Sequence, residues 1–154
     1  RWSSSDCRKS VGSRRNEARP PVSEVSPWLM ATRLQVRFRD CDPLGHVNNA
    51  VYLTYLENAR FAIWKAQGAT GMILARAEVD FRSQSRYGDE LEVRLRLEGF
   101  GRSSFRYEYE IVDVPSQRVV VTAKTVQVHF DYAAQVPVPL SEELRAKLST
   151  PVAP

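Results

Sequence analysis

Two aspartates separated by one residue stand just ahead of a long apolar segment, in the stretch DCDPLGHVNNAVYLTYLENAR at residues 40–60. A Pro-Leu-Gly turn follows Asp42, and Asn48 and Asn49 are of the type that begins helices. The first turn of a helix carries N–H groups without intrahelical partners. The spacing therefore places carboxylates beside free hydrogen-bond donors, an arrangement suited to chemistry rather than to packing alone.

Other reactive residue types are sparse. The two histidines of the chain, His46 and His129, lie far apart in the sequence and neither has neighbours at metal-ligand spacing, so no bound metal is expected. Cys41 lies between Asp40 and Asp42, and negative charge on both sides disfavours the thiolate that a nucleophilic cysteine needs. A cysteine nucleophile is therefore the less favoured interpretation.

Composition predicts one soluble globular domain. The 154 residues are 43% hydrophobic and 26% charged, which is ordinary for a domain with a single core. No apolar run approaches the roughly 20 residues of a membrane-spanning helix, so no membrane association is expected. Cys7 and Cys41 make a poor disulfide framework, which predicts a reducing, cytoplasmic location.

Basic residues are concentrated at the N-terminus. Residues 1–29 carry six Lys or Arg against three acids, so only +1 of the formal charge of +4 belongs to the rest of the chain, which gives no support for nucleic-acid binding. The same residues are rich in Ser, Arg and Pro, and strand-like alternation begins only at Met30. We interpret them as an extension to a single domain at residues 30–154. Three origins of residues 1–29 are considered. We favour a translated upstream stretch or cloning remnant, with the natural start at Met30, over a transit sequence or a disordered tail.

One long helix is predicted at residues 50–67, about 27 Å long at 1.5 Å per residue, with Gly68 as its natural stop. Apolar side chains at helical spacing form its central stripe: Tyr52, Leu56, Ala59 and Ile63. Further apolar side chains widen that stripe: Leu53, Tyr55, Ala62 and Ala66. So broad an apolar surface suits a helix wrapped by a sheet.

Alternation with period two on both sides of this helix predicts strands, and hence an α+β fold. Before the helix, Leu34, Val36 and Phe38 share one face of a first strand. After it, short connections predict an antiparallel meander of four strands. Their apolar positions fall at residues 75–81, 91–97 and 105–111 and in a run at 118–130 that is apolar on both faces. A short helix at residues 142–148, capped by Ser141, closes the chain.

Residues 40–53, D-C-D-P-L-G-H-V-N-N-A-V-Y-L, resemble the signature of the 4-hydroxybenzoyl-CoA thioesterase family, including its acyl-CoA thioesterases. A-E-V-D-F at 77–81 and Y-G-D-E-L at 87–91 are similar to that family's second strand and the turn into its third. The H-V-N-N element also resembles that of acyl-acyl carrier protein thioesterases. The resemblance covers residues 30–148 and implies the hotdog fold, a curved antiparallel sheet wrapped around one long helix.

The resemblance also assigns roles in the hydrolysis of an acyl-CoA thioester. The catalytic carboxylate is the second acid of D-x-D-x-x-G, here Asp42, which would attack the thioester carbonyl or activate a water. The oxyanion would lie at the helix start, where the family's donor, a backbone N–H seven residues beyond the acid, falls on Asn49. Asp40 is then a structural acid.

Neighbouring residues of the motif have expected roles of their own. Gly45 would adopt a backbone conformation that other residues cannot adopt, and would allow the chain to approach the substrate closely. His46 is either a general acid or base or a turn-stabilising group. Asn48, beside the substrate, is expected to cap the helix. Glu57 is interpreted as solvated or paired at an interface, although another hotdog subgroup uses a helix carboxylate in catalysis.

The chain departs from this family at two positions. Many bacterial members have a His seven residues beyond the acid and a Tyr four residues before it, where this chain has Asn49 and Phe38. The backbone N–H of residue 49 is present whichever side chain stands there. We therefore expect altered activity and not a loss of activity. Arg82 and Arg86 lie near turns and are candidates to bind the phosphates of coenzyme A, which arrives with the substrate; no tightly held cofactor is implied.

The resemblance further implies a homodimer or homotetramer with the substrate between subunits. An acyl-acyl carrier protein thioesterase is one alternative to an acyl-CoA thioesterase, and two further alternatives stay open. A hotdog hydratase or dehydratase would need a pair of His and acid, and is disfavoured because the long helix has no His. A non-catalytic protein that binds acyl-CoA or acyl carrier protein would keep the fold without turnover.

Overall fold

The computed structural model describes residues 28–152, so the predicted extension lies outside the described residues except for its last two. Both of these pack against the domain. Leu29 is buried and its N–H donates to the carbonyl of Leu95 at 2.9 Å, while the ring of Trp28 lies 5.2 Å from the guanidinium of Arg96. Within this described part, no helix has the length and apolar character needed to cross a membrane.

The predicted long helix is α1 (Asn49–Gln67), which begins one residue earlier than expected. Local chemistry sets both of its ends. The side chain of Asn48 accepts a hydrogen bond from the N–H of Ala50 at 2.9 Å, and Gly68 ends the helix with a left-handed φ of 63°.

The central stripe of α1 is buried as predicted, since none of its four residues is more than 3% exposed. The residues expected to widen the stripe differ in burial. Tyr55 is buried and Ala62 is half-buried, whereas Ala66 is exposed and Leu53 remains 42% exposed. The buried face of α1 is thus narrower than the apolar pattern suggested.

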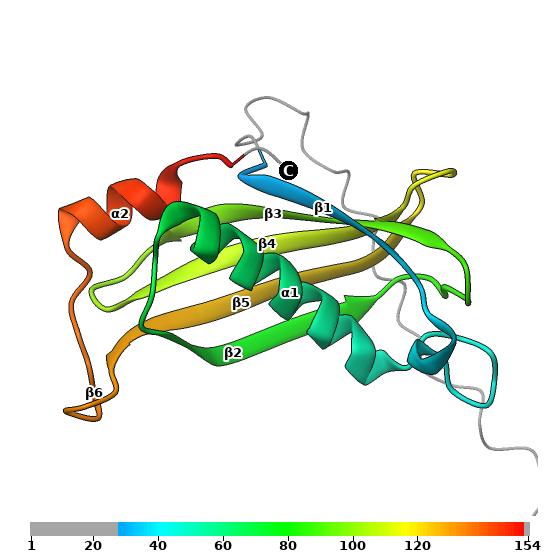
Figure 1. The fold of residues 1–154 in the computed structure, drawn as a ribbon, viewed down its shortest axis with the longest axis horizontal. Helices are drawn as coiled ribbons and strands as arrows, with labels where there is room; N and C mark the ends of the chain where they lie inside the picture. The colour runs from blue at the N-terminus through cyan, green and yellow to red at the C-terminus, as the bar shows by residue number, and fades with distance from the viewer. Residues whose placement is uncertain (1–27, 153–154) are drawn as a thin grey trace, which may run out of the picture.

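Six antiparallel strands form one sheet in the order β1-β3-β4-β5-β2, with β6 paired to the end of β5. Their bounds are β1 (Met30–Gln35), β2 (Met72–Phe81), β3 (Glu90–Phe100), β4 (Ser104–Asp113), β5 (Val119–Asp131) and β6 (Val136–Pro137). A 3-10 helix (Phe38–Asp40) follows β1, and α2 (Glu142–Ser149), capped by Ser141, closes the described chain. Figure 1 shows α1 lying across one face of this curved sheet, which confirms the α+β hotdog fold.

The core lies between α1 and the sheet face that the helix covers. Register places side chains from neighbouring strands in common rows on this face. One row joins Leu95, Tyr109 and Ala123, all at most 6% exposed. The predicted apolar sides of β3 and β4 are therefore confirmed. β5, predicted to be apolar on both faces, is buried on the helix side but half-buried or exposed at Thr122, Lys124 and Val126 on the other.

The predicted meander is right for β3, β4 and β5 and wrong for β2. β2 pairs with β5, with Phe81 opposite Val121, and not with the strand that follows it in sequence. The loop at residues 82–89 carries the chain to the other side of the sheet, so that β3 pairs with β1. Short connections favour neighbouring strands, and here the loop is just long enough to override that preference.

The prediction that Phe38 shares a strand face with Leu34 and Val36 is wrong. β1 ends at Gln35, and Phe38 lies in the 3-10 helix with 81% of its surface exposed. The cause is local, because the N–H of Asp40 donates to the carbonyl of Arg37 at 3.0 Å and bends the chain out of the strand.

The edge strand β2 keeps an apolar strip open to solvent. Leu74 and Phe81 are 45% and 46% exposed, and the small side chain of Ala77 is exposed as well. Two apolar residues of α1 are also exposed, Leu53 at 42% and Phe61 at 55%. The outer edge of β2 and part of α1 thus form an uncovered apolar surface.

Candidate active site

A tight loop between the 3-10 helix and α1 holds the carboxylate of Asp42. Its Oδ1 accepts hydrogen bonds from the N–H of Leu44 at 2.8 Å and of His46 at 3.4 Å. Gly45 has a φ of 80°, a left-handed angle that other residues adopt only with strain, as the sequence predicted. The backbone thus fixes one carboxylate oxygen of Asp42, while its Oδ2 makes no hydrogen bond with any described residue.

Asp40, the other aspartate of the motif, anchors this loop from inside. It is 3% exposed, and its carboxylate accepts three hydrogen bonds from Arg37 at 3.0 Å each and one from the hydroxyl of Tyr55 at 2.8 Å. Burial acts to raise the pKa of Asp40, but the hydrogen bonds from Arg37 and Tyr55 outweigh it and leave the pKa below its usual value. The carbonyl of Asp40 also accepts the N–H of Asn48 at 2.9 Å. Asp40 therefore joins the end of β1 to the start of α1, the structural role predicted for it.

The start of α1 offers a free donor beside this loop. The Asn48 cap takes up the N–H of Ala50 with its side chain and that of Val51 with its carbonyl. Between residues 28 and 152 no hydrogen bond engages the N–H of Asn49. Because the positive end of the helix dipole also lies here, the Asn49 N–H is suited to bind a developing negative charge.

Asp42 and Asn49 line one hollow of about 310 Å³, where the start of α1 meets the end of β2. The remaining lining residues are His46, Val47, Tyr52, Phe81, Arg82, Ser83 and Gln84. The rings of Tyr52 and Phe81 lie 5.8 Å apart and make its apolar wall. A carboxylate with one free oxygen, a free backbone donor and an apolar wall form a site suited to acyl transfer.

A family model adds an independent finding. The model of the thioesterase-like superfamily matches residues 36–148, a range that contains the Asp42 loop, α1 and strands β2 to β6. The chain belongs to the thioesterase-like superfamily. Several characterised or solved members of this superfamily are similar to the chain over most of its described residues.

Two relatives and one solved structure illustrate the range of this superfamily. The chain is 30% identical over 123 residues to a chloroplastic acyl-acyl carrier protein thioesterase of Arabidopsis thaliana, covering 74% of this chain and 64% of that protein. It is 28% identical over 127 residues to the long-chain acyl-CoA thioesterase of Escherichia coli strain K12, covering 77% and 96%. A Thermus thermophilus thioesterase complexed with coenzyme A and Zn is 35% identical, with a TM-score of 0.71 and coverage of 79% and 98%. The chain thus spans less than two thirds of the plant protein and nearly all of the two bacterial ones.

In this thioesterase-like chain, the hollow brings together four of the predicted site residues: Asp42, His46, Asn49 and Arg82. Arg82 lies at its rim, and its guanidinium turns toward the outer face of the sheet. There its Nη2 lies 3.1 Å from Asp80 Oδ2 and its Nε donates to the hydroxyl of Thr122 at 3.3 Å. Arg82 is therefore placed at the mouth of the site and not inside it.

Three other predicted residues do not line the hollow. Gly45 shapes the loop, and a side chain at its position would meet no atom within 4 Å. Asn48 serves as the helix cap. Arg86 is exposed in the loop after β2, where its N–H donates to Asp89 at 2.8 Å.

The site also contains residues that sequence reasoning missed. The sequence pattern assigns Tyr52 to the core and Phe81 to an apolar strand face. Both positions carry the expected apolar character, but they lie where α1 and the edge strand leave a hollow between them. Ser83 and Gln84 come from the loop after β2 and have no sequence signal that would place them there.

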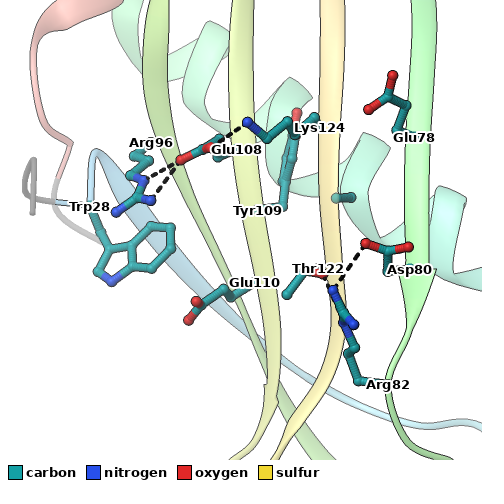
Figure 2. A pocket seen from close by; sticks show the side chains of 11 residues that line it. Trp28, Glu78, Asp80, Arg82, Arg96, Glu108, Tyr109, Glu110, Thr122 and Lys124 are labelled. Atoms are coloured by element: carbon teal, nitrogen blue, oxygen red, sulfur yellow. Dashed lines mark hydrogen bonds and ion pairs between the residues drawn. The ribbon is translucent and has the colours of Figure 1, made fainter. Parts of the chain in front are cut away.

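A second hollow, of about 280 Å³, lies on the opposite face of the sheet, as Figure 2 shows. Its three cations are paired with acids of the same face. Arg96 and Lys124 both contact Glu108, at 2.6 and 2.9 Å, and Arg82 contacts Asp80 at 3.1 Å. Such internally neutralised charges form a solvated surface network rather than an anion site.

No metal centre is found in the described range. There, no three His, Cys, Asp or Glu side chains lie close enough together to hold an ion. Of the two histidines, His46 lines the hollow and His129 lies on β5.

Proposed function

We propose that the protein hydrolyses an acyl thioester, with Asp42 as the catalytic carboxylate and the N–H of Asn49 as the oxyanion donor. The observation that carries this proposal is that both groups line one hollow and that Asp42 Oδ2 and the Asn49 N–H have no partner among the described residues. Membership of the thioesterase-like superfamily supports the same reaction class.

The reaction breaks the bond between the acyl carbon and sulfur and forms a bond from that carbon to oxygen. Asp42 either removes a proton from the attacking water or adds to the carbonyl and forms an anhydride that water then cleaves. In both routes the carbonyl oxygen becomes an oxyanion, and the Asn49 N–H stabilises it; one such donor contributes roughly 3 to 4 kcal/mol. The thiolate leaves and takes up a proton, which yields a carboxylic acid and a free thiol.

Coenzyme A is the thiol carrier that we favour. Arg82 at the rim and the exposed Arg86 lie on the loop beside the hollow, where a diphosphate could bind to guanidinium groups. The Thermus thermophilus relative holds coenzyme A, and the Escherichia coli relative is an acyl-CoA thioesterase. The plant relative is named for acyl carrier protein, so the acyl carrier is the second candidate.

We further propose that the working form is a homodimer or homotetramer. The open edge of β2 and the exposed apolar side chains of Leu53, Phe61 and Leu74 are available to a second copy. Because Phe81 belongs both to this strand and to the hollow, a second copy would also complete the wall of the site.

Two other functions compete with this proposal. A non-catalytic acyl-CoA or acyl carrier binding protein would use the same hollow without turnover. A hydratase or dehydratase would need His46 to act with Asp42, since α1 carries no His. Neither alternative accounts for a free donor at the helix start as directly as an oxyanion does.

The cytoplasmic location predicted from the two cysteines is kept as part of the proposal. Cys41 carries a free thiol, as cysteines usually do in reducing compartments. One relative is chloroplastic, so fractionation of the source cells is the measurement that checks this expectation.

The first test is thiol release from short, medium, long and aromatic acyl-CoAs and from acyl carrier protein esters, with the full chain. Asp42→Asn keeps the hydrogen bonds of the loop but removes the charge, and we expect it to lower kcat by about 10²- to 10⁴-fold. Asp131→Asn is the matched control, because Asp131 is an exposed residue at the end of β5 whose carboxylate also accepts backbone N–H groups and does not line the hollow.

The alternatives give different results in the same assay. Turnover that survives in Asp42→Asn would contradict the assigned role of Asp42. Binding of acyl-CoA by the wild-type chain without thiol release from any ester would instead identify the non-catalytic protein. Release of water-addition products from an enoyl-CoA would identify the hydratase.

A further inference from the structure

Helix α1 carries an arginine inside the core. The side chain of Arg60 is only 4% exposed, although arginine is rarely buried without a close partner. Its nearest acid is the half-exposed Glu57, with 3.7 Å between Nη2 and Oε1. The guanidinium lies 5.5 Å from the ring of Trp64, and its Nε has no hydrogen-bond partner in the described structure. A buried charge held this weakly is unfavourable unless another group binds it.

Three further buried polar groups in the same region lack partners among residues 28–152. They are the indole Nε1 of Trp64, the hydroxyl of Tyr107 and the amide Oε1 of Gln127. These residues are 5%, 0% and 0% exposed. Burial raises the pKa of Tyr107, while a side-chain contact from the Trp64 indole and the charge of Arg60 oppose that rise, so the hydroxyl keeps its proton and has the indole as its neighbour. Buried polar groups seldom lack well-formed hydrogen bonds, and four that lack them here leave hydrogen-bonding capacity for another partner.

The helix connects these groups to the hollow. Tyr52, Leu56, Arg60 and Trp64 recur at intervals of four residues and share one face of α1. Tyr52 lines the hollow. From Asn49 to Arg60 the helix rises about 16 Å, and the arginine side chain leans back toward the helix start.

The sheet provides a second connection between the same two places. Phe81 lines the hollow, and further along β2 Ala77 lies on the same face, opposite Thr125 of β5. The hydroxyl of Thr125 accepts a hydrogen bond from the amide of Gln127, one of the four unpaired residues. The half-buried Val79 lies between Phe81 and Ala77 on this face, and the residues Ala77 and Ala123, the latter opposite Val79, are small.

We infer that Arg60, Trp64, Tyr107 and Gln127 bind an oxygen-bearing group on the acyl chain, so that the protein selects acyl thioesters with a hydroxyl or carboxylate near their far end. The inference rests on the proposed function, which places the thioester carbonyl at Asn49. The span along α1 then matches roughly eight to twelve carbons of an extended chain. Arg60 and Trp64 donate to the oxygen, and Tyr107 and Gln127 accept the hydrogen of a hydroxyl. An alkyl chain would leave all four groups unpaired, which disfavours it.

The test compares three series of coenzyme A esters of eight, ten and twelve carbons: plain alkyl, ω-hydroxy and ω-carboxy. We expect the wild-type chain to hydrolyse one oxygenated series with at least tenfold higher kcat/KM than the alkyl series. A preference for ω-carboxy esters identifies recognition through the charge of Arg60, and a preference for ω-hydroxy esters identifies recognition by the neutral groups.

Variants of Arg60 separate this role from a structural one. Arg60→Met keeps much of the side-chain volume without the charge, and it should lower kcat/KM for the preferred oxygenated series at least tenfold while the alkyl series changes less than threefold. Arg60→Lys should keep part of the preference if the ligand is a carboxylate. Glu57→Gln, which changes only the half-exposed partner, is the matched control. Thermal unfolding confirms that each variant is folded.

Measuring the binding of the esters tests this inference independently of turnover. Calorimetric titration of the same esters into Asp42→Asn should show the oxygenated preference, and Asp42→Asn with Arg60→Met should lack it. Turnover of alkyl esters in preference to oxygenated ones, or an equal loss on all series in Arg60→Met, would overturn this inference and leave the thioesterase proposal standing. Failure of every ester both to turn over and to bind would overturn the two together.

Discussion

The two aspartates of the motif have different surroundings. Asp40 is buried, and both its oxygens are hydrogen-bonded to Arg37 or Tyr55. Asp42 has one oxygen held by backbone N–H groups and one free. The two residues are of the same type, and it is their hydrogen-bond partners that make Asp40 an anchor and leave one oxygen of Asp42 free.

The Asp40 anchor predicts a specific loss of stability in acid. The pKa of Asp40 in the folded chain lies below its usual value of 3.8, so the unfolded chain binds the proton more readily. The stabilisation is therefore complete above about pH 4 and is lost as the pH falls through the lowered folded-state pKa. Urea unfolding between pH 2.5 and 7 should show a shallower acid decline in Asp40→Asn than in the wild-type chain.

Two comparisons sharpen that test. At pH 7, Asp40→Asn should lower the free energy of unfolding by about 1.5 to 3 kcal/mol, the range for a hydrogen bond to a charged group. Tyr55→Phe keeps the carboxylate and removes one donor, so it should cost less and keep most of the acid decline. Parallel pH profiles for wild type and Asp40→Asn would show that other acids govern the decline.

Motif register predicted a structural role for Asp40 and a catalytic role for Asp42, and the catalytic role stays a prediction. No sequence signal indicated that Arg60 would be buried. Periodicity locates apolar faces by counting apolar residues, and an arginine within such a face is expected at the surface. Arg60 is buried in the same core as Tyr107, which comes from a strand far along the chain. Such contacts depend on tertiary packing and cannot be predicted from local sequence patterns.

Helix α1 shows the same distinction among secondary-structure elements. Its limits at Asn48 and Gly68 depend on residues adjacent in sequence, and both were predicted within one residue. The order of the strands depends on pairing across the whole domain, and there β2 was misplaced. The sequence therefore predicted the two α-helices and strands β1 to β5, but not the 3-10 helix, β6 or the edge that β2 occupies.

The cap of α1 offers a direct test of the helix start. Asn48→Ala removes the acceptor for the N–H of Ala50 and should lower the free energy of unfolding by about 1 kcal/mol. Asn58→Ala is the matched control, since Asn58 is exposed in the middle of the same helix and alanine favours helix there. Chemical denaturation of the two variants checks the difference. Equal losses would indicate that the Asn48 side chain contributes nothing beyond its helix propensity.

The whole molecule presents its uncovered apolar surface along β2 and one side of α1. If a second copy covers it, Leu74→Lys combined with Phe61→Lys should convert the oligomer into a monomer, because burying two unpaired cations is unfavourable. Light scattering coupled to size-exclusion chromatography measures the mass. Val136→Lys, at an equally exposed apolar position on β6, should leave the mass unchanged. A wild-type chain that is monomeric at all concentrations would contradict the proposed assembly.

The pairing of β2 with β5 has a consequence for synthesis of the chain. Phe81 leaves the ribosome about forty residues before Val121, the residue opposite it, and until then β2 has no strand to join. The loop that follows β2 is also fastened to β5, since the N–H groups of Arg82 and Ser83 donate to the carbonyl of Val120. A nascent chain that ends before β5 therefore has its reactive loop and its helix but no hollow between them. The hollow can therefore form only late in translation, when the last long strand joins β2 to the sheet.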